Sequence, residues 1–203
     1  MKRSTVTTMV SMAALVVITM IMPACAYATD ADESVVSSEV DEAEQLAAEQ
    51  EEFISAAGKS AQPSKEKYGV PPSVTVAQAI LESGWGDSKL ARESKNYFGM
   101  KCKDGNHGPF AVDCVKTATR ECDKKGKCFD TKAWFRVYDS RADSFSDHGS
   151  WLASNARYAP AFDHTDDADA FIKEVHKAGY ATDPDYSDKI IGIMKKHDLY
   201  RFN

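Results

Sequence analysis

A glutamate lies at the end of a strongly apolar helical segment, beside two glycines and a tryptophan. Residues 77–86 read AQAILESGWG. Glu82 is expected in the last helical turn, where the helix dipole disfavours a carboxylate, so its pKa should be raised. A raised pKa suits a general acid that protonates a glycosidic oxygen. Gly84 and Gly86 allow close approach of a ligand, and the Trp85 indole offers a face for a sugar ring. The alternative is an ordinary surface glutamate.

Glycoside hydrolysis usually needs a second carboxylate. The chain has many, so spacing alone does not choose one. Glu121 stands out because it directly precedes Cys122, and a disulfide there would hold its backbone in place. A solvated hairpin charge is the alternative interpretation.

The elements that must position Glu82 can be predicted from local patterns. The apolar residues Val74, Ala77 and Ile80 follow the helical period after Pro71-Pro72. We therefore predict a helix with Ser73 as its N-cap and Gly84 as its stop. A second short helix is predicted over 88–93.

The remaining pattern predicts an α+β fold that is mostly helical with one small β lobe. A short helical stretch over 53–57 and a loop around 62–64 are expected before the main helix. Residues 98–137 predict irregular hairpins with a tip near 124–126. Helical periodicity returns over 145–152 and 171–178, and a last helix is expected to start with Pro184 in its first turn. Trp134, Trp151 and His148 are expected in the core.

The N-terminal 28 residues are typical of a signal peptide. Lys2 and Arg3 precede a largely apolar run, and the small residues Ala26 and Ala28 suit cleavage after Ala28. A retained membrane anchor is the alternative, although the run is short for a bilayer span. A lipid-modified Cys25 is a further alternative. Residues 29–52 predict an acidic, solvated linker that becomes transiently helical toward its end, and residues 53–203 the functional domain.

Four cysteines remain after such a cleavage, within a short hydrophilic segment. Their spacing contains no C-x-x-C pair, which argues against structural zinc. Four cysteines allow three pairings, of which we predict Cys102–Cys114 and Cys122–Cys128. Disulfides persist outside the cytoplasm, so this prediction agrees with export.

The charge of the chain is unevenly distributed. The formal net charge is −6, with 25 Lys and Arg against 31 Asp and Glu. Residues 29–52 hold ten acids and no base, and the first 28 residues hold two bases; 23 bases and 21 acids remain, a charge of +2. No dense basic cluster indicates a nucleic-acid partner. The five histidines are scattered, so we expect no metal and no cofactor.

Several motifs together resemble one family. Residues 73–101, SVTVAQAILESGWGDSKLARESKNYFGMK, are similar to the bacterial endo-β-N-acetylglucosaminidase family, which includes flagellar muramidase domains and autolysins of the lysozyme-like superfamily. The likeness continues in WFRVYDS at 134–140, DHGSWL at 147–152 and AGYATDPDYSDKI at 178–190. It covers about residues 53 to 198 and implies a lysozyme-like fold.

The resemblance also implies roles for individual residues. The catalytic glutamate of the family corresponds to Glu82, and its second acid, from a Thr-x-Glu-like segment, to Glu121. Tyr186 corresponds to a tyrosine near the catalytic acid. The expected glycan-binding residues are Trp85, Asn96, Phe98 and Tyr180. The cysteine-rich segment departs from the family pattern.

We therefore predict a secreted or wall-associated monomer that cleaves peptidoglycan after N-acetylglucosamine, without a transmembrane segment in its mature form. Glu121 would activate water or stabilise the cationic sugar; in a third route the substrate's acetamido group is the nucleophile, held by Tyr186. One alternative is a muramidase or lytic transglycosylase acting on the same polymer. Another is a non-catalytic wall-binding module.

Overall fold

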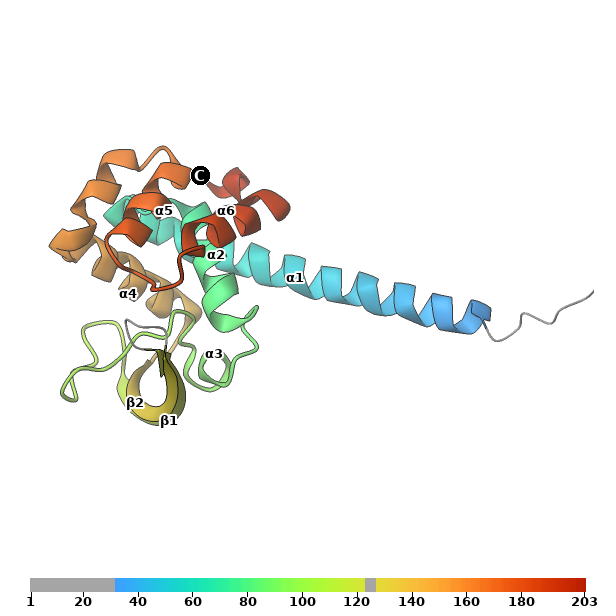
Figure 1. The fold of residues 1–203 in the computed structure, drawn as a ribbon, viewed down its shortest axis with the longest axis horizontal. Helices are drawn as coiled ribbons and strands as arrows, with labels where there is room; N and C mark the ends of the chain where they lie inside the picture. The colour runs from blue at the N-terminus through green and yellow to red at the C-terminus, as the bar shows by residue number, and fades with distance from the viewer. Residues whose placement is uncertain (1–31, 123–126) are drawn as a thin grey trace, which may run out of the picture. The chain divides into compact units, whose positions relative to one another are not determined.

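The computed structural model describes residues 32–122 and 127–203, with side chains over 40–120 and from 127 onward. The signal peptide and Cys25 predicted above, and the hairpin tip near 124–126, lie outside the described residues. Residues 42–203 form one compact unit that contains the core and the site. In chain order the elements are α1 (Asp32–Tyr68), α2 (Pro72–Ser83), α3 (Lys89–Ser94), β1 (Asp113–Cys122), β2 (Cys128–Val137), α4 (Arg141–Ser154), η1 (Ala156–His164), α5 (Ala168–Lys177), α6 (Tyr186–Lys196) and η2 (Leu199–Phe202) (Figure 1).

The fold is mostly helical, as predicted, with one two-stranded antiparallel sheet. Helix α2 lies at the centre of the compact unit, where it contacts α5, α6 and η2. Its residues from Pro72 to Ile80 are buried, because the helix is covered on nearly all sides. Strands β1 and β2 form a separate ribbon, and Figure 1 shows it on the opposite side of α2 from α5 and α6.

Helix α1 runs through the segment where we predicted a linker and a loop. It is one helix from Asp32 to Tyr68, and Pro63 lies inside it. The prediction of a loop around 62–64 is therefore wrong. Phe53, Ile54, Ala57 and Ala61 are buried in the core at helical spacing, and this burial outweighs the hydrogen bond that Pro63 cannot donate.

The predicted bounds of the main helix differ slightly at its start and agree at its end. Helix α2 begins at Pro72 with Pro71 as N-cap, so the expected Ser73 cap is wrong; Pro72 occupies a first-turn position where its missing N–H is not needed. Gly84 ends the helix in the left-handed region with φ 57°, as predicted. Helix α6 begins at Tyr186, after Pro184 rather than at it.

The ribbon is pinned to the preceding loop by a disulfide. Cys102 and Cys114 are joined, as predicted, with their Cα atoms 6.2 Å apart. Cys128 is also disulfide-bonded, and strand register places it opposite Cys122. The side chain of Cys122 lies outside the described part, so the Cys122–Cys128 pairing stays a prediction.

Three residues with ring side chains were expected in the core, and their burial differs. Trp134 is 49% exposed on the ribbon, so its assignment to the core is wrong: a two-stranded ribbon offers too little surface to cover an indole. Trp151 is partly buried against the core. His148 is fully buried, as expected, but its Nδ1 has no hydrogen-bond partner among the described residues.

Candidate active site

The turn after α2 presents Glu82 at the end of a rigid helix. Gly84 and Trp85 both adopt positive φ angles, 57° and 62°, which turns the chain sharply away from the helix axis. The Ser83 hydroxyl donates to the carbonyl of Ala79 at 2.5 Å and accepts from the backbone N–H of Gly86 at 2.8 Å. These two bonds fix the turn, so Glu82 projects from a defined position.

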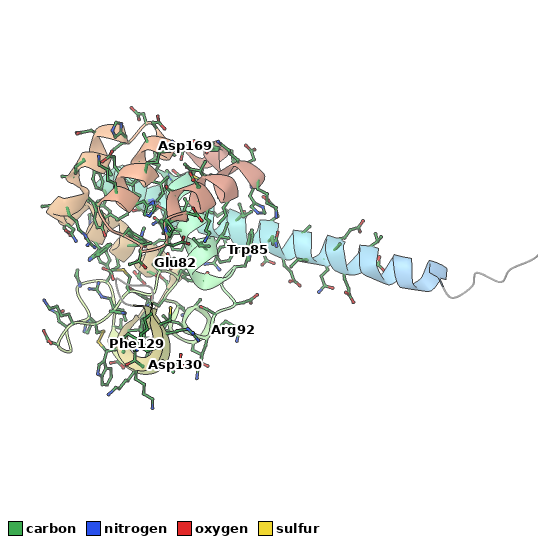
Figure 2. All side chains as sticks on the ribbon, in the orientation of Figure 1. Glu82, Trp85, Arg92, Phe129, Asp130 and Asp169 are labelled. Carbon is green, nitrogen blue, oxygen red and sulfur yellow. A yellow bond between two sulfur atoms is a disulfide. The ribbon has the colours of Figure 1, made fainter. Side chains whose placement is uncertain are left out.

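Glu82 lies on a cleft of about 720 Å³ between the helical part of the compact unit and the ribbon. Figure 2 shows Glu82 at the junction of these two parts. The cleft walls come from the end of α2, the segment 98–101, both strands, α4, the segment 180–183 and α6. Three of the expected site residues, Phe98, Tyr180 and Tyr186, line the cleft together with Glu82.

The surroundings of Glu82 raise the pKa of its carboxyl group. The side chain is reached by solvent from the open side of the cleft, while the walls withdraw bulk water from it. This desolvation raises the pKa above its usual value, and a hydrogen bond from Tyr186 partly offsets the rise. The Tyr186 hydroxyl donates to Glu82 Oε1 at 3.1 Å. A carboxyl group in this state is suited to donate a proton.

Tyr186 is held from two directions behind the cleft. The buried side chain of Gln78 donates from Nε2 to the Tyr186 hydroxyl at 3.0 Å. The Tyr180 ring stacks on the Tyr186 ring, with centroids 5.5 Å apart and planes at 27°. Burial raises the pKa of the Tyr186 phenol, and the nearby Glu82 raises it further, so the phenol keeps its proton and remains a donor.

A buried histidine supports the Tyr180 wall. His148 Nε2 lies 3.2 Å from the Tyr180 hydroxyl, and Phe98 stacks on the imidazole with centroids 4.0 Å apart. Burial lowers the pKa of His148 to about 3, so the ring is neutral at ordinary pH. The stack therefore orders one wall of the cleft without adding charge.

Asn96 does not line the cleft but shapes it. Its buried side chain donates from Nδ2 to the carbonyls of Met100 and Arg136, each at 2.9 Å, and accepts from the Met100 N–H at 2.9 Å. It thereby joins the cleft segment 98–101 to strand β2. Asn96 is thus buried beside the cleft, and its expected contact with glycan stays a prediction.

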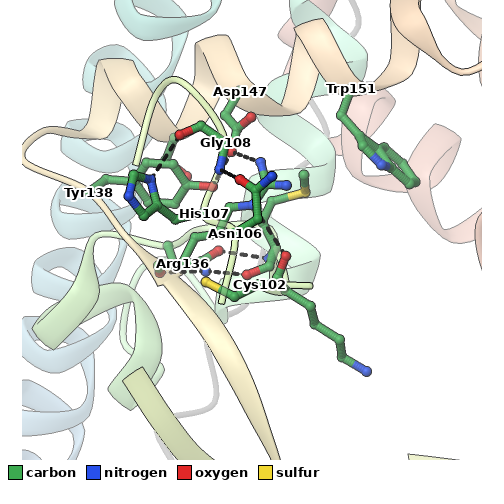
Figure 3. Close-up of polar contacts among 12 residues, drawn as sticks. Cys102, Asn106, His107, Gly108, Arg136, Tyr138, Asp147 and Trp151 are labelled. Carbon is green, nitrogen blue, oxygen red and sulfur yellow. Dashed lines mark hydrogen bonds and ion pairs between the residues drawn. The ribbon is translucent and has the colours of Figure 1, made fainter. Parts of the chain in front are cut away.

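A buried ion pair anchors the same part of the ribbon to α4 (Figure 3). Arg136 Nη1 donates to Asp147 Oδ2 at 2.5 Å, and the Tyr138 hydroxyl donates to the same oxygen at 2.6 Å. Arg136 also donates from Nε to the Lys101 carbonyl at 3.2 Å. No local pattern predicts this network, because its partners come from separate elements.

The structure places Trp85 away from the cleft. Its ring packs edge-on against Phe53 and His197, with centroid distances of 6.0 and 4.9 Å, and it is not among the residues that line the cleft. The side chain of Glu121 lies outside the described part. Its backbone pairs with Phe129 in the ribbon, and its neighbour Arg120 lines the cleft.

The charged side chains of the cleft are mostly basic. Lys189 pairs with Asp183 at 2.5 Å at one side, and the remaining bases of the lining are Lys101, Arg120 and Arg136. No group of three or more His, Cys, Asp or Glu side chains with metal-ligand geometry occurs in the described ranges. Across the same ranges, no helix is long and apolar enough to cross a membrane.

Comparison with known proteins agrees with this geometry. Residues 58–199 match the Glucosaminidase family, described as mannosyl-glycoprotein endo-beta-N-acetylglucosaminidase. The chain belongs to this family and carries a glycoside hydrolase domain, as its sequence motifs indicated.

Individual relatives show the same likeness. The exo-glucosaminidase LytG of Bacillus subtilis is 39% identical over 76% of this chain and 54% of its own length. A probable N-acetylmuramidase of Lactococcus lactis is 35% identical over 75% of this chain and 35% of its own length. The chain thus spans about half or less of these relatives.

A solved structure extends the likeness to the fold. The catalytic domain of the autolysin Auto from Listeria monocytogenes superimposes with a TM-score of 0.65 at 25% identity, over 81% of this chain and 97% of that domain. The lysozyme-like α+β fold predicted from the sequence is confirmed.

Proposed function

We propose that this protein is an exported peptidoglycan hydrolase that cleaves the β-1,4 bond after N-acetylglucosamine within glycan strands. The observation that carries the proposal is the state of Glu82, a carboxyl group with a raised pKa on an open cleft, hydrogen-bonded by a phenol that keeps its own proton. The family match and the name of LytG as an exo-glucosaminidase support the choice of bond.

In this mechanism Glu82 acts as the general acid. Its proton passes to the glycosidic oxygen while the bond from that oxygen to the anomeric carbon breaks, so the leaving sugar departs as a neutral alcohol. Because desolvation raises the pKa of Glu82, a larger fraction of this carboxyl group is protonated at a given pH than for an ordinary glutamate. The water that adds to the anomeric carbon then gives up a proton.

The acceptor of that proton distinguishes the possible routes. Glu121 is the proposed base, or the group that stabilises the cationic sugar. In the third route the substrate's acetamido oxygen attacks the anomeric carbon and Tyr186 helps to hold it. Product stereochemistry followed by NMR separates them: the α-anomer appears first if a Glu121-activated water attacks directly, and the β-anomer appears first if the acetamido group does.

The charge of the cleft suits this substrate. Lys101 and Arg120 line the cleft in addition to the Lys189–Asp183 pair and to Arg136, which is paired with Asp147. Peptidoglycan stem peptides carry free carboxylates, whereas neutral polymers of N-acetylglucosamine carry none. We therefore expect peptide-bearing strands to be better substrates than neutral chitin-type oligomers, with the difference decreasing as salt increases.

A digest of purified cell wall tests the bond. Mass spectrometry should find reducing N-acetylglucosamine at the new ends. Reducing N-acetylmuramic acid would instead support a muramidase, the second candidate, which is favoured by the likeness to the Lactococcus lactis protein. An anhydro-muramic end would indicate a lytic transglycosylase.

Substitution of the acid tests the mechanism. Glu82→Gln keeps the shape and removes the proton, so hydrolysis should fall on the order of 100-fold or more, with thermal unfolding little changed. Retained turnover in this variant would reject Glu82 as the acid. Wall binding without hydrolysis in the unmodified protein would support a non-catalytic module.

Export is proposed from the N-terminal pattern and the disulfides. Disulfides such as Cys102–Cys114 persist in oxidising compartments. Mass measurement of the protein recovered from the culture medium or the wall should show a chain that starts at residue 29. A chain that retains residues 1–28 in the membrane fraction would contradict this.

A further inference from the structure

One turn before Glu82, a buried amide contacts the same phenol that Glu82 contacts. Gln78 and Glu82 are four residues apart on α2, so they share a face of the helix. Gln78 Nε2 donates to the Tyr186 hydroxyl at 3.0 Å, and that hydroxyl donates to Glu82 Oε1 at 3.1 Å. The two side chains of one helix therefore hold the phenol between them.

The chemistry of the three side chains determines which group donates in each of the two hydrogen bonds. An amide nitrogen can only donate, whereas a phenol has one proton to give and an oxygen that accepts. Because the Tyr186 oxygen accepts from Gln78, its single proton is directed to Glu82. We propose that Gln78 is a positioning residue for the general acid, because it orients the Tyr186 hydroxyl toward Oε1 and leaves Oε2 to carry the proton that is transferred.

The second oxygen of Glu82 is free for this task. No hydrogen bond to Oε2 is found in the part of the chain that the structure describes, so the protonated form can place its proton there without breaking an existing contact. The inference rests on the proposed role of Glu82 as the acid. It adds that the group that orients the Tyr186 hydroxyl toward Glu82 is Gln78, in the interior of the fold.

Packing alone does not explain a buried glutamine at position 78, because burying its amide opposes folding. It is fully buried on a helix whose other interior residues include Val74, Ala77 and Ile80. Its Oε1 has no hydrogen-bond partner among the described residues, and an unsatisfied buried acceptor opposes folding. An apolar side chain of similar size would avoid that cost, which favours a role for the Nε2 donor.

The proposal has a measurable consequence for the pH dependence. The Tyr186 hydrogen bond lowers the pKa of Glu82 against the rise caused by desolvation. Without the Gln78 donor, the phenol can turn its proton elsewhere, and the pKa of Glu82 should rise. An acid works only while protonated, so activity falls as pH passes upward through its pKa. The basic limb of the rate profile should therefore move to higher pH.

Other ionisable groups face this site, and the experiment must separate their effect on the pH–rate profile from that of Glu82. His176 and Tyr180 pack against the Tyr186 ring, at centroid distances of 5.7 and 5.5 Å. The charged residues that line the cleft with Glu82 are Lys101, Arg120, Arg136, Asp183 and Lys189. His176 is the histidine that packs directly against the Tyr186 ring, so His176→Gln is the matched control and should leave the difference between variants unchanged.

The test compares Gln78→Met, Tyr186→Phe and the double variant in the full chain. The readout is kcat and KM on purified peptidoglycan across the pH range. Gln78→Met should lower kcat by about 10-fold through loss of alignment, leave KM nearly unchanged and move the basic limb upward. Tyr186→Phe should move the limb in the same direction. The double variant should equal Tyr186→Phe, because Gln78 acts through the phenol.

Several results would overturn the proposal. One is a Gln78→Met variant whose basic limb of the pH–rate profile does not move. Such a variant, even with a lower melting temperature, would indicate that Gln78 has a packing role only. Another is a double variant whose losses are additive. If Gln78→Met does not fold, Gln78→Asn keeps the amide but withdraws the donor, and the same comparison applies. Failure of the proposed bond specificity would appear in the released ends and would leave these profiles interpretable.

Discussion

The ion pair between Arg136 and Asp147 connects strand β2 to helix α4, and its removal has a calculable effect. Asp147 Oδ2 accepts from Arg136 at 2.5 Å and from the Tyr138 hydroxyl at 2.6 Å. The exposed fractions of the two charged side chains are 16% for Arg136 and 4% for Asp147. Asp147→Asn preserves the shape of the side chain and removes its charge.

The expected loss follows from this burial. Removing one partner of a buried pair costs about 3–5 kcal/mol, because the other charge stays buried without compensation. Arg136 keeps some exposure and its bond to the Lys101 carbonyl, which places the loss near the lower end, about 3 kcal/mol. For a chain of this size each kcal/mol shifts Tm by roughly 2–4 °C, so Tm should fall by roughly 6–12 °C.

Urea unfolding followed by circular dichroism measures this loss. The matched control is Glu174→Gln, which breaks the exposed Lys177–Glu174 pair of 3.2 Å and should cost less than about 1 kcal/mol. In a double-mutant cycle, Arg136→Met combined with Asp147→Asn should recover part of the loss, since no unpaired charge remains. A loss below about 1 kcal/mol for Asp147→Asn, equal to the surface control, would refute the reasoning.

Further predictions concern the packing of α4 and the disulfide. Gly149→Ala should destabilise the protein by about 1–3 kcal/mol, because a Cβ there would lie 1.8 Å from the Ser64 hydroxyl of α1. Gly192 lies in α6, where an added Cβ meets nothing within 4 Å. Gly192→Ala should therefore leave the free energy of unfolding unchanged or raise it by up to about 1 kcal/mol through helix propensity. Thermal melts of the two variants check this, and equal shifts would contradict it. Replacing Cys102 and Cys114 together by serine should cost about 2–3 kcal/mol at most, given the 12-residue separation. Non-reducing peptide mapping should recover the Cys102–Cys114 pair, and free thiols at both positions would reject it.

Local patterns predicted the element that carries the acid. The apolar period of α2 and the glycine at position 84 indicated where the helix ends, and the structure has Gly84 as its left-handed cap. The short helix α3 was expected over 88–93 and occurs over Lys89–Ser94, with the Ser88 side chain accepting from the Ala91 N–H. These features depend on neighbours within one or two turns, which the sequence displays directly.

The errors occurred where distant contacts outweigh local preference. Pro63 predicts a break, yet α1 continues through it because Ile54, Ala57 and Ala61 are buried in the core. Trp134 was expected in the core because it falls at a core-like position in the sequence pattern, but its strand belongs to a ribbon that leaves it exposed. The contacts of the Trp85 ring with Phe53 and His197 also join distant parts of the chain.

The sequence by itself determined the family of the domain and pointed to Glu82 as the proposed acid, because the residues around Glu82 form a continuous motif along one helix end. Gln78 and Glu82 are four residues apart on α2 and share a face of that helix. Only the tertiary structure brought Tyr186 from α6 between them, and only it joined Asp147 to Arg136 and Tyr138. Hydrogen bonds between side chains of different elements depend on how those elements pack, and packing is set by the whole core rather than by any local pattern.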